Sequence, residues 1–287
     1  MTSSGDAPWL PIATGAALAV VLVALVASSW EPLPHYWEYR GGRRLDIEAR
    51  VHDRRVRVTD LSGGDRKPRV LEIEDLLSGE ECDRIVALAR DRGLVRSHMV
   101  FGSEEERAKA RMDARTSTQV FLDQFEDVVL DRIARRIENL TLLPAENSEQ
   151  MQVVHYDPGQ HYWAHYDYLP QESVRSRWRA YREGKTADNR FATVLFYLND
   201  VERGGETVFP RFTPHWSAER HGWDQRVCNE SFPSLRVSPK KGNGILFYNM
   251  RGWKLDEYSL HGGCDPLSGE KWAANLWLHL YPFQQLQ

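Results

Sequence analysis

Cysteine is scarce in this sequence of 287 residues, which contains only Cys82, Cys228 and Cys264. None of them has the close spacing that structural zinc sites use, and three cysteines do not make a disulfide-rich scaffold. One disulfide with one remaining thiol is still compatible with this number. The chain must therefore be stabilised mainly by a hydrophobic core, and its length and 41% hydrophobic content suffice for one large domain with appendages.

The sequence also lacks an excess of positive charge. Its 37 lysines and arginines are interspersed with 41 acidic residues, which gives a formal net charge of −4. A protein that binds phosphate backbones needs a broad basic surface. We therefore expect no nucleic-acid partner.

Charged residues are absent from Trp9 to Trp30, and the interior of this stretch, residues 16–27, is almost wholly apolar. At ~1.5 Å per residue, it is long enough to cross a hydrocarbon core of ~30 Å. A cleaved signal peptide is the alternative, because Ala27-Ser28-Ser29 offers small residues, but no Lys or Arg precedes the segment. A buried core helix is less consistent with the N-terminal position. We expect a single-pass membrane anchor within residues 1–30.

Residues 31–69 are rich in Pro, Gly and Arg with little apolar periodicity, which predicts a linker. Residues 70–145 should form a helical first part of a catalytic domain. Ser78 and Glu81 have capping-box spacing at the start of a helix that runs to about Gly93. Apolar residues at intervals of three and four predict a second amphipathic helix over 123–140.

Residues 146–287 have a different texture, with short runs of β-branched and aromatic residues between turn-forming residues. Several short strands at this spacing predict a sandwich or jelly roll with helices packed on one face, and hence an α+β fold. The polar insertion Gln171–Arg190 is expected to be a flap or a solvated helix. The expected strands are Val70–Ile73, Met151–Tyr156, His161–Tyr168, Phe191–Leu198, Glu206–Phe209, Leu235–Val237, Ile245–Tyr248 and Trp272–Tyr281.

One pair of side chains in these strands could bind a metal ion. His165 and Asp167 are two residues apart, and strand alternation would place them on the same face. Two histidines and one carboxylate form the facial triad of iron(II) oxygenases, which leaves coordination positions open. His155 and His161 share the alternating face of His165, so the spacing alone leaves the choice of histidine open.

A further histidine and a lysine follow on the last predicted strands. His261 stands in a glycine-flanked turn, where backbone can approach closely, and is the candidate for the third ligand. Lys271 follows ten residues later and could neutralise the far carboxylate of a dicarboxylate bound to the same metal. An ordinary surface lysine is the alternative for Lys271.

Beyond these side chains, the sequence resembles the prolyl 4-hydroxylase family, and within it looks most like the transmembrane prolyl 4-hydroxylase. The similarity covers roughly residues 70–282 and is densest after residue 150. It depends on ordered blocks that include His155–Gln160, His165–Asp167, Ala192–Asn199, Gly204–Pro210, Asp256–Cys264 and Lys271–Asn275.

The resemblance implies a double-stranded β-helix and hydroxylation of prolyl residues, 4-hydroxylation by the family name, with release of succinate and CO₂. It also implies Fe²⁺, 2-oxoglutarate and O₂, with ascorbate as reductant and a proline-containing protein or peptide as substrate. Carried over by position, it gives iron ligation to His165, Asp167 and His261, 2-oxoglutarate binding to Lys271, Tyr156 and Thr193, and the peptide groove to Tyr162, Trp277 and His279.

Two other functions use the same residues. A zinc hydrolase could employ the same three ligands with water, although Lys271 and the absence of an obvious general base count against it. A membrane-tethered binding module could retain the fold without turnover. The sequence identifies neither the substrate nor the oligomeric state, and it does not separate 4- from 3-hydroxylation.

The resemblance further implies that the catalytic domain faces the lumen of the endoplasmic reticulum, where Cys228 could pair with Cys264 and leave Cys82 buried. The arginines that follow the predicted anchor, at positions 40, 43, 44 and 50, oppose this orientation, since the positive-inside bias would place them in the cytosol.

Overall fold

The computed structural model describes residues 46–63, 67–97, 114–169, 189–213, 216–217, 225–251 and 254–282. Its helices are α2 (Gly79–Arg92), α4 (Val128–Thr141) and the short 3-10 turns η1 (Ala145–Asn147), η2 (Pro210–Phe212), η3 (Gln225–Cys228) and η4 (Glu257–Ser259). Its strands are β1 (Asp46–Val51), β2 (Arg54–Asp60), β3 (Val70–Glu74), β4 (Val95–Arg96), β5 (Thr118–Leu122), β6 (Met151–Tyr156), β7 (Tyr162–His165), β8 (Ala192–Tyr197), β9 (Arg203–Gly204), β10 (Thr207–Phe209), β11 (Leu235–Val237), β12 (Gly244–Tyr248), β13 (Met250–Arg251), β14 (Lys254–Leu255), β15 (His261–Gly263), β16 (Pro266–Ser268) and β17 (Lys271–Leu278).

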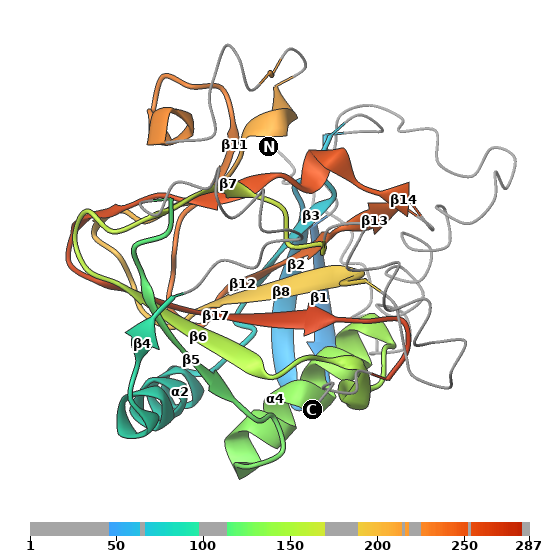
Figure 1. Cartoon of the computed structure of the whole chain (residues 1–287). Coiled ribbons are helices and arrows are strands. Elements are labelled where there is room, and N and C mark those ends of the chain that lie inside the picture. The colour runs from blue at the N-terminus through green and yellow to red at the C-terminus, as the bar shows by residue number, and fades with distance from the viewer. Residues whose placement is uncertain are drawn as a thin grey trace, which may run out of the picture.

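Two antiparallel sheets make up most of this fold (Figure 1). The major sheet has the strand order β1-β2-β3-β12-β8-β17-β6-β5-β4, and the minor sheet has the order β11-β10-β15-β7. Several neighbours are distant in sequence, among them β3 and β12 in the major sheet and β7 and β15 in the minor sheet, so the chain passes repeatedly between the two sheets. This arrangement agrees with the expected mostly β jelly roll.

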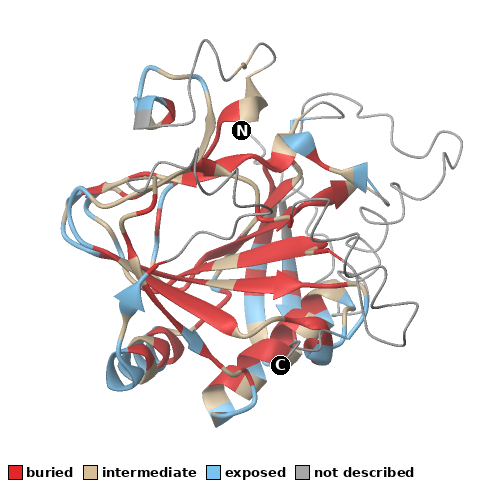
Figure 2. Cartoon of the chain, in the orientation of Figure 1, coloured by how far each residue is buried: buried red, intermediate tan, exposed pale blue. Residues whose placement is uncertain are grey.

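Helices α2 and α4 pack on one face of the major sheet, and their apolar sides join its side chains in the main core (Figure 2). The expected capping box begins α2: Ser78 accepts from the Glu81 backbone N–H, and Glu81 accepts from the Ser78 backbone N–H. The second helix begins later than residue 123, because Asp127 caps it through the Val129 N–H. Residues 123–127 form the turn that precedes it.

The two faces of strand β17 lie in different surroundings, the hydrophobic core on one side and a cavity on the other. Ala274, Leu276 and Leu278 point into the core beneath the helices. The alternate residues, among them Lys271 and Trp277, line a cavity on the opposite face. Because side chains alternate along a strand, one buried strand supplies both core and site.

The prediction that residues 31–69 form a linker was wrong for residues 46–60. Strands β1 and β2 make an antiparallel hairpin that extends the major sheet through β3. Fully buried Arg136 of α4 ties this hairpin to α2, because its guanidinium lies 2.9 Å from Asp53 Oδ1 and 2.8 Å from Glu81 Oε1. The alternation of Ala49, Val56 and Val58, all buried, was obscured by the surrounding arginines.

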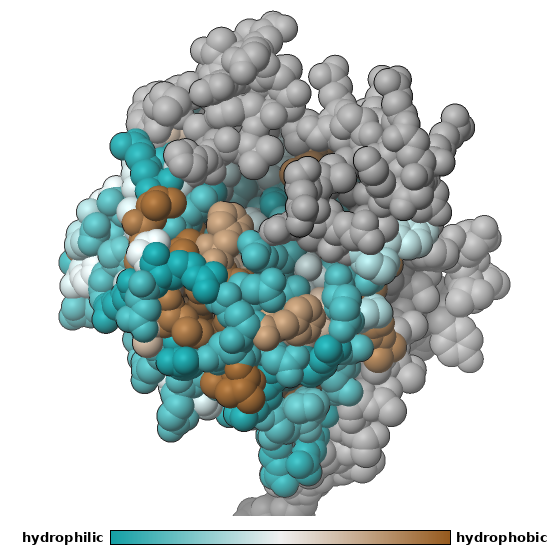
Figure 3. Space-filling view, turned by 60° about the horizontal axis from the view of Figure 1, so that its bottom comes forward, coloured by the Kyte–Doolittle hydropathy of each residue, from teal (hydrophilic) through white to brown (hydrophobic). Residues whose placement is uncertain are grey.

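No helix in the described part of the chain is long and apolar enough to cross a membrane. The expected anchor at Trp9–Trp30 and most of the insertion Gln171–Arg190 lie outside the described residues. On the face in Figure 3, the described residues are mainly hydrophilic, and the hydrophobic ones form separate small patches. Among the described residues, most large apolar side chains are buried between the sheets and helices.

Candidate active site

A cavity of about 320 Å³ lies between the two sheets. The major sheet contributes side chains from β5, β6, β8 and β17, and the minor sheet contributes β7, β10 and β15. Its walls contain both aromatic rings and charged groups. Among the sequence-predicted site residues, those that line it are Tyr156, Tyr162, His165, Asp167, His261, Lys271 and Trp277.

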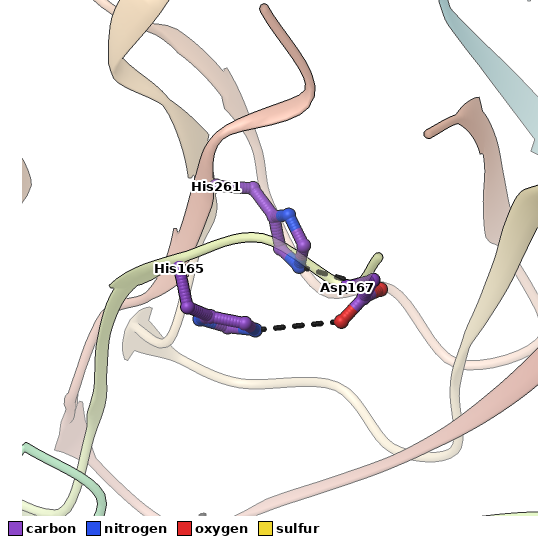
Figure 4. A group of neighbouring side chains, drawn as sticks. All are labelled: His165, Asp167 and His261. Atoms are coloured by element: carbon purple, nitrogen blue, oxygen red, sulfur yellow. Dashed lines mark ion pairs between the residues drawn. The ribbon is translucent and has the colours of Figure 1, made fainter. Parts of the chain in front are cut away.

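Three potential metal ligands converge in this cavity (Figure 4). His165 Nε2 lies 3.6 Å from Asp167 Oδ1, and His261 Nε2 lies 3.6 Å from Asp167 Oδ2. All three ligand atoms lie within 4.8 Å of one another. The histidines are brought together by the pairing of β7 with β15, in which His165 is opposite His261.

Hydrogen bonds to the backbone orient both imidazoles. His165 Nδ1 lies 2.8 Å from the Trp163 carbonyl oxygen, and His261 Nδ1 lies 2.9 Å from that of Ser259. A carbonyl can only accept, so each Nδ1 carries a proton, and in the neutral imidazole the lone pair of Nε2 can bind a metal. Burial lowers the pKa of His261 to about 4, which keeps this imidazole neutral at physiological pH.

Asp167 lies beyond the end of strand β7, whereas the sequence had predicted it within the strand. Strand β7 ends at His165, so strand alternation does not position Asp167. Instead, the Thr193 hydroxyl donates to Asp167 Oδ2 at 2.8 Å, and Arg190 donates to the Asp167 carbonyl oxygen at 3.2 Å. Thr193 is fully buried and is not among the residues that line the cavity, so its expected role as a 2-oxoglutarate ligand stays a prediction.

Lys271 is a buried cation in the same cavity. Its ammonium donates to the Gly205 carbonyl oxygen at 2.6 Å and forms no salt bridge with residues that the structure describes. Gly205 follows Gly204, and both have positive φ angles, so their backbone can turn toward the lysine. Burial lowers the pKa of Lys271 to about 8, partly offset by Glu206. A buried ammonium without a counterion favours an anionic ligand.

Tyr156 and Thr207 lie in the same cavity as this lysine. The Tyr156 ring centroid is 5.6 Å from Lys271 Nζ. Thr207 was not among the predicted site residues, but it lines the cavity, and its hydroxyl accepts from the Tyr197 hydroxyl at 2.9 Å. Thr207 belongs to the block Gly204–Pro210, which carries part of the family resemblance. The 2-oxoglutarate-binding threonine was instead assigned to Thr193 in the block Ala192–Asn199.

An ion pair and aromatic rings form another part of the cavity wall. Glu149 binds Arg190 through contacts of 2.6 and 2.9 Å, and Arg190 stacks over the Trp277 ring at 3.5 Å. Burial by itself raises the pKa of Glu149, but Arg190 and His279 outweigh it and lower this pKa to about 2. The sequence did not predict the pair, because its members are 41 residues apart.

Tyr162 and His279 had been assigned together with Trp277 to the groove. Tyr162 lines the cavity and stacks on His165, with ring centroids 3.5 Å apart. His279 does not line it: the side chain is fully buried, and its Nε2 lies 3.0 Å from Glu149 Oε1. His279 follows the end of β17 and contacts the Glu149 carboxylate without itself lining the cavity.

The two rival histidines lie elsewhere. His155 Nε2 lies 2.6 Å from Glu270 Oε2, and its ring packs against Trp272. His161 Nδ1 contacts the Gly159 carbonyl oxygen at 3.3 Å. Neither residue lines the cavity, so the structure resolves the choice in favour of His165.

A disulfide lies close to the third candidate ligand. Cys228 and Cys264 are bridged, with their Cα atoms 5.6 Å apart, and Cys82 is a buried free thiol, both as expected. Cys264 comes three residues after His261. The bridge therefore ties the segment at η3 to the strand that carries this histidine.

Comparisons with known proteins agree with this architecture. The sequence profile of the 2OG-Fe(II) oxygenase superfamily matches residues 151–279. Prolyl 4-hydroxylase 5 of Arabidopsis thaliana is 36% identical over 245 residues, which span 80% of this chain and 79% of that protein. Prolyl 4-hydroxylase 2 of the same plant is 36% identical over 224 residues, covering 77% of this chain and 70% of that protein.

A similar solved structure is the viral collagen prolyl hydroxylase of Paramecium bursaria Chlorella virus-1 in its 2OG complex. It is 27% identical with a TM-score of 0.50, and the match covers 76% of this chain and 97% of that chain. The residues matched by the family model include the candidate ligands His165, Asp167 and His261. The chain therefore belongs to the prolyl 4-hydroxylase family of 2OG-Fe(II) oxygenases and is an oxidoreductase.

Proposed function

We propose that this enzyme hydroxylates prolyl residues of a protein or peptide at the 4-position, with iron(II), 2-oxoglutarate and oxygen. The observation that carries the proposal is that one cavity contains both a two-histidine, one-carboxylate group and a buried ammonium without a carboxylate partner in the described structure. The first arrangement suits iron(II) with open coordination positions, and the second suits a dicarboxylate co-substrate.

The donor set fits the metal. His165 and His261 present unprotonated Nε2 atoms, and Asp167 adds a negative charge between them. When bound, iron(II) with 2-oxoglutarate and oxygen supplies the oxidation that converts a substrate C–H bond to C–OH and yields succinate and CO₂. Lys271 binds the far carboxylate of 2-oxoglutarate, with Tyr156 and Thr207 beside it. Ascorbate is proposed as reductant on family resemblance alone.

The aromatic part of the cavity is proposed to hold the substrate peptide. The Tyr162 ring stacks on His165, and the Arg190 guanidinium stacks on the Trp277 ring. Both rings line the cavity that contains the candidate metal site. Aromatic rings provide apolar surface for a prolyl ring at little entropic cost. The name of the viral relative, a collagen prolyl hydroxylase, supports a proline-containing substrate for this chain.

Mass spectrometry of proline-containing peptides tests this function. Purified protein with Fe²⁺, 2-oxoglutarate and ascorbate should add one oxygen atom to a prolyl residue and form succinate in equal amount. Fragmentation and comparison with 4-hydroxyproline standards locate the hydroxyl group. Succinate formation without peptide oxidation would point to another substrate, and peptide cleavage would favour a hydrolase. Absence of both activities would favour a binding module.

The affinity for 2-oxoglutarate should fall as the pH rises through about 8. Burial lowers the pKa of Lys271 to about 8, and only its ammonium form attracts a carboxylate. Above that pH the free enzyme must first take up a proton, so the dissociation constant should rise up to about tenfold per pH unit. Direct binding measured anaerobically between pH 7 and 9.5 checks this, and a constant affinity across the range would contradict the assigned role.

We also propose that the enzyme is anchored by residues 9–30 with its catalytic domain in the lumen of the endoplasmic reticulum. The Cys228–Cys264 bridge supports an oxidising compartment, since such bonds are rare in the cytosol. In sealed microsomes the catalytic domain should resist added protease until detergent is present. Digestion without detergent would place the domain in the cytosol, as the arginines after the anchor suggest.

A further inference from the structure

A short chain of buried hydrogen bonds leads from the major sheet to the candidate metal site. Asn249 Nδ2 donates to Thr193 Oγ1 at 2.9 Å, and Thr193 Oγ1 donates to Asp167 Oδ2 at 2.8 Å. Both Asn249 and Thr193 are fully buried, and neither lines the cavity. They therefore reach any ligand only through Asp167.

The chemistry of the three groups fixes the direction of this chain. A hydroxyl has a single hydrogen to donate, whereas a carboxylate can only accept. The Thr193 hydrogen therefore goes to Asp167, and its oxygen must accept from Asn249. That requirement orients the Asn249 amide, with its nitrogen toward Thr193. The side-chain oxygen of Asn249 is then left without a partner in the described structure.

Such an arrangement has a cost. A buried acceptor without a hydrogen bond destabilises the folded protein, so an apolar residue at this position would give a more stable fold. Backbone bonds hold Asn249 in place, because its N–H donates to the Phe191 carbonyl oxygen and its own carbonyl oxygen accepts from Asp256. The amide is thus presented rigidly to Thr193.

The three candidate ligands differ in how the fold holds them. His165 and His261 are opposite each other on paired strands β7 and β15. Asp167 lies beyond the end of β7, where no ladder fixes it. Thr193 belongs to β8, which is hydrogen-bonded on both sides within the major sheet, with Phe247 of β12 opposite it. The hydrogen bond from Thr193 thus ties a ligand on a loop to a central strand.

We infer that Thr193, oriented by Asn249, is the positioning residue of the metal site, and that it fixes the Asp167 carboxylate between the two imidazoles before an ion binds. This inference rests on the proposed iron site. The Thr193 hydroxyl donates to Oδ2, which also lies 3.6 Å from His261 Nε2, whereas Oδ1 lies 3.6 Å from His165 Nε2 and stays available to an ion. Outer-sphere partners of this kind typically contribute 10- to 100-fold to metal affinity.

Cobalt(II), which is stable in air and has visible absorption bands when bound by nitrogen and oxygen ligands, provides the direct test. Thr193→Val keeps the shape of the side chain but removes the hydroxyl, and should weaken Co²⁺ binding about 10- to 100-fold and change the bands. Thr193→Ser restores the hydroxyl and should bind within about threefold of wild type. Thr59→Val, a matched change on β2 away from the cavity, should leave binding unchanged.

The Asn249→Ala variant tests whether the two residues act as one chain. Because Asn249 works only through the Thr193 hydroxyl, adding Thr193→Val to Asn249→Ala should weaken Co²⁺ binding less than the same change in wild type. Thermal unfolding without metal shows that each variant is folded. Equal Co²⁺ affinity in wild type and Thr193→Val, or equal loss in Thr193→Ser and Thr193→Val, overturns the inference. Failure of the wild type to bind Co²⁺ or Fe²⁺ instead overturns the proposed function.

Discussion

An Asp167→Ala variant should lose detectable 2-oxoglutarate turnover and most of its affinity for iron(II). Asp167 supplies the only negative charge of the three-donor group and lies 3.6 Å from both imidazoles. Without it only two imidazole donors remain, so the site loses one of its three ligands and the negative charge that attracts a dication. Anaerobic iron titration and succinate formation measure the two losses, and His165→Ala should behave in the same way.

Asp157→Ala is the matched control for this experiment. Asp157 is an exposed carboxylate close in sequence, and it does not line the cavity. Its removal should leave both iron affinity and turnover near the wild-type values. Substantial turnover in Asp167→Ala would show that the oxygenase reaction does not depend on this carboxylate and would contradict the proposed triad.

A Lys271→Met variant should bind 2-oxoglutarate far more weakly while its iron affinity changes little. The variant keeps an apolar stem in the cavity but leaves the far carboxylate of the co-substrate without a charged partner. Breaking a buried ion pair on one side typically costs ~3–5 kcal/mol, which corresponds to a factor of roughly 10² to 4 × 10³ in affinity. Water entering the cavity would reduce the loss.

The Michaelis constant for 2-oxoglutarate and the anaerobic dissociation constant of iron(II) separate the two effects. Lys240→Ala removes an exposed lysine and should change neither quantity. If Lys271→Met kept the wild-type Michaelis constant for 2-oxoglutarate, the co-substrate would have to be bound elsewhere in the cavity. A loss of iron affinity as large as that for 2-oxoglutarate would instead indicate a general collapse of the site.

Local sequence signals determined much of this fold. The capping box at Ser78 begins α2, and runs of β-branched and aromatic residues became strands, two of them, β6 and β11, with the predicted bounds. Such signals act within one element, through side-chain alternation or a single cap, so they can be read without the rest of the chain. They failed at β1 and β2, where exposed arginines alternate with buried apolar residues.

For the site, the sequence and its family resemblance predicted the candidate residues His165, Asp167, His261 and Lys271 from ligand type and order along the chain. The structure brings all four into one cavity. Tertiary structure decided how they are held. In the structure the Thr193 hydroxyl donates to Asp167, the His279 ring contacts Glu149, and Glu149 forms an ion pair with Arg190. These contacts join segments from different strands and loops. They depend on which face each strand presents and on where it ends, and neither is set by the residues in contact.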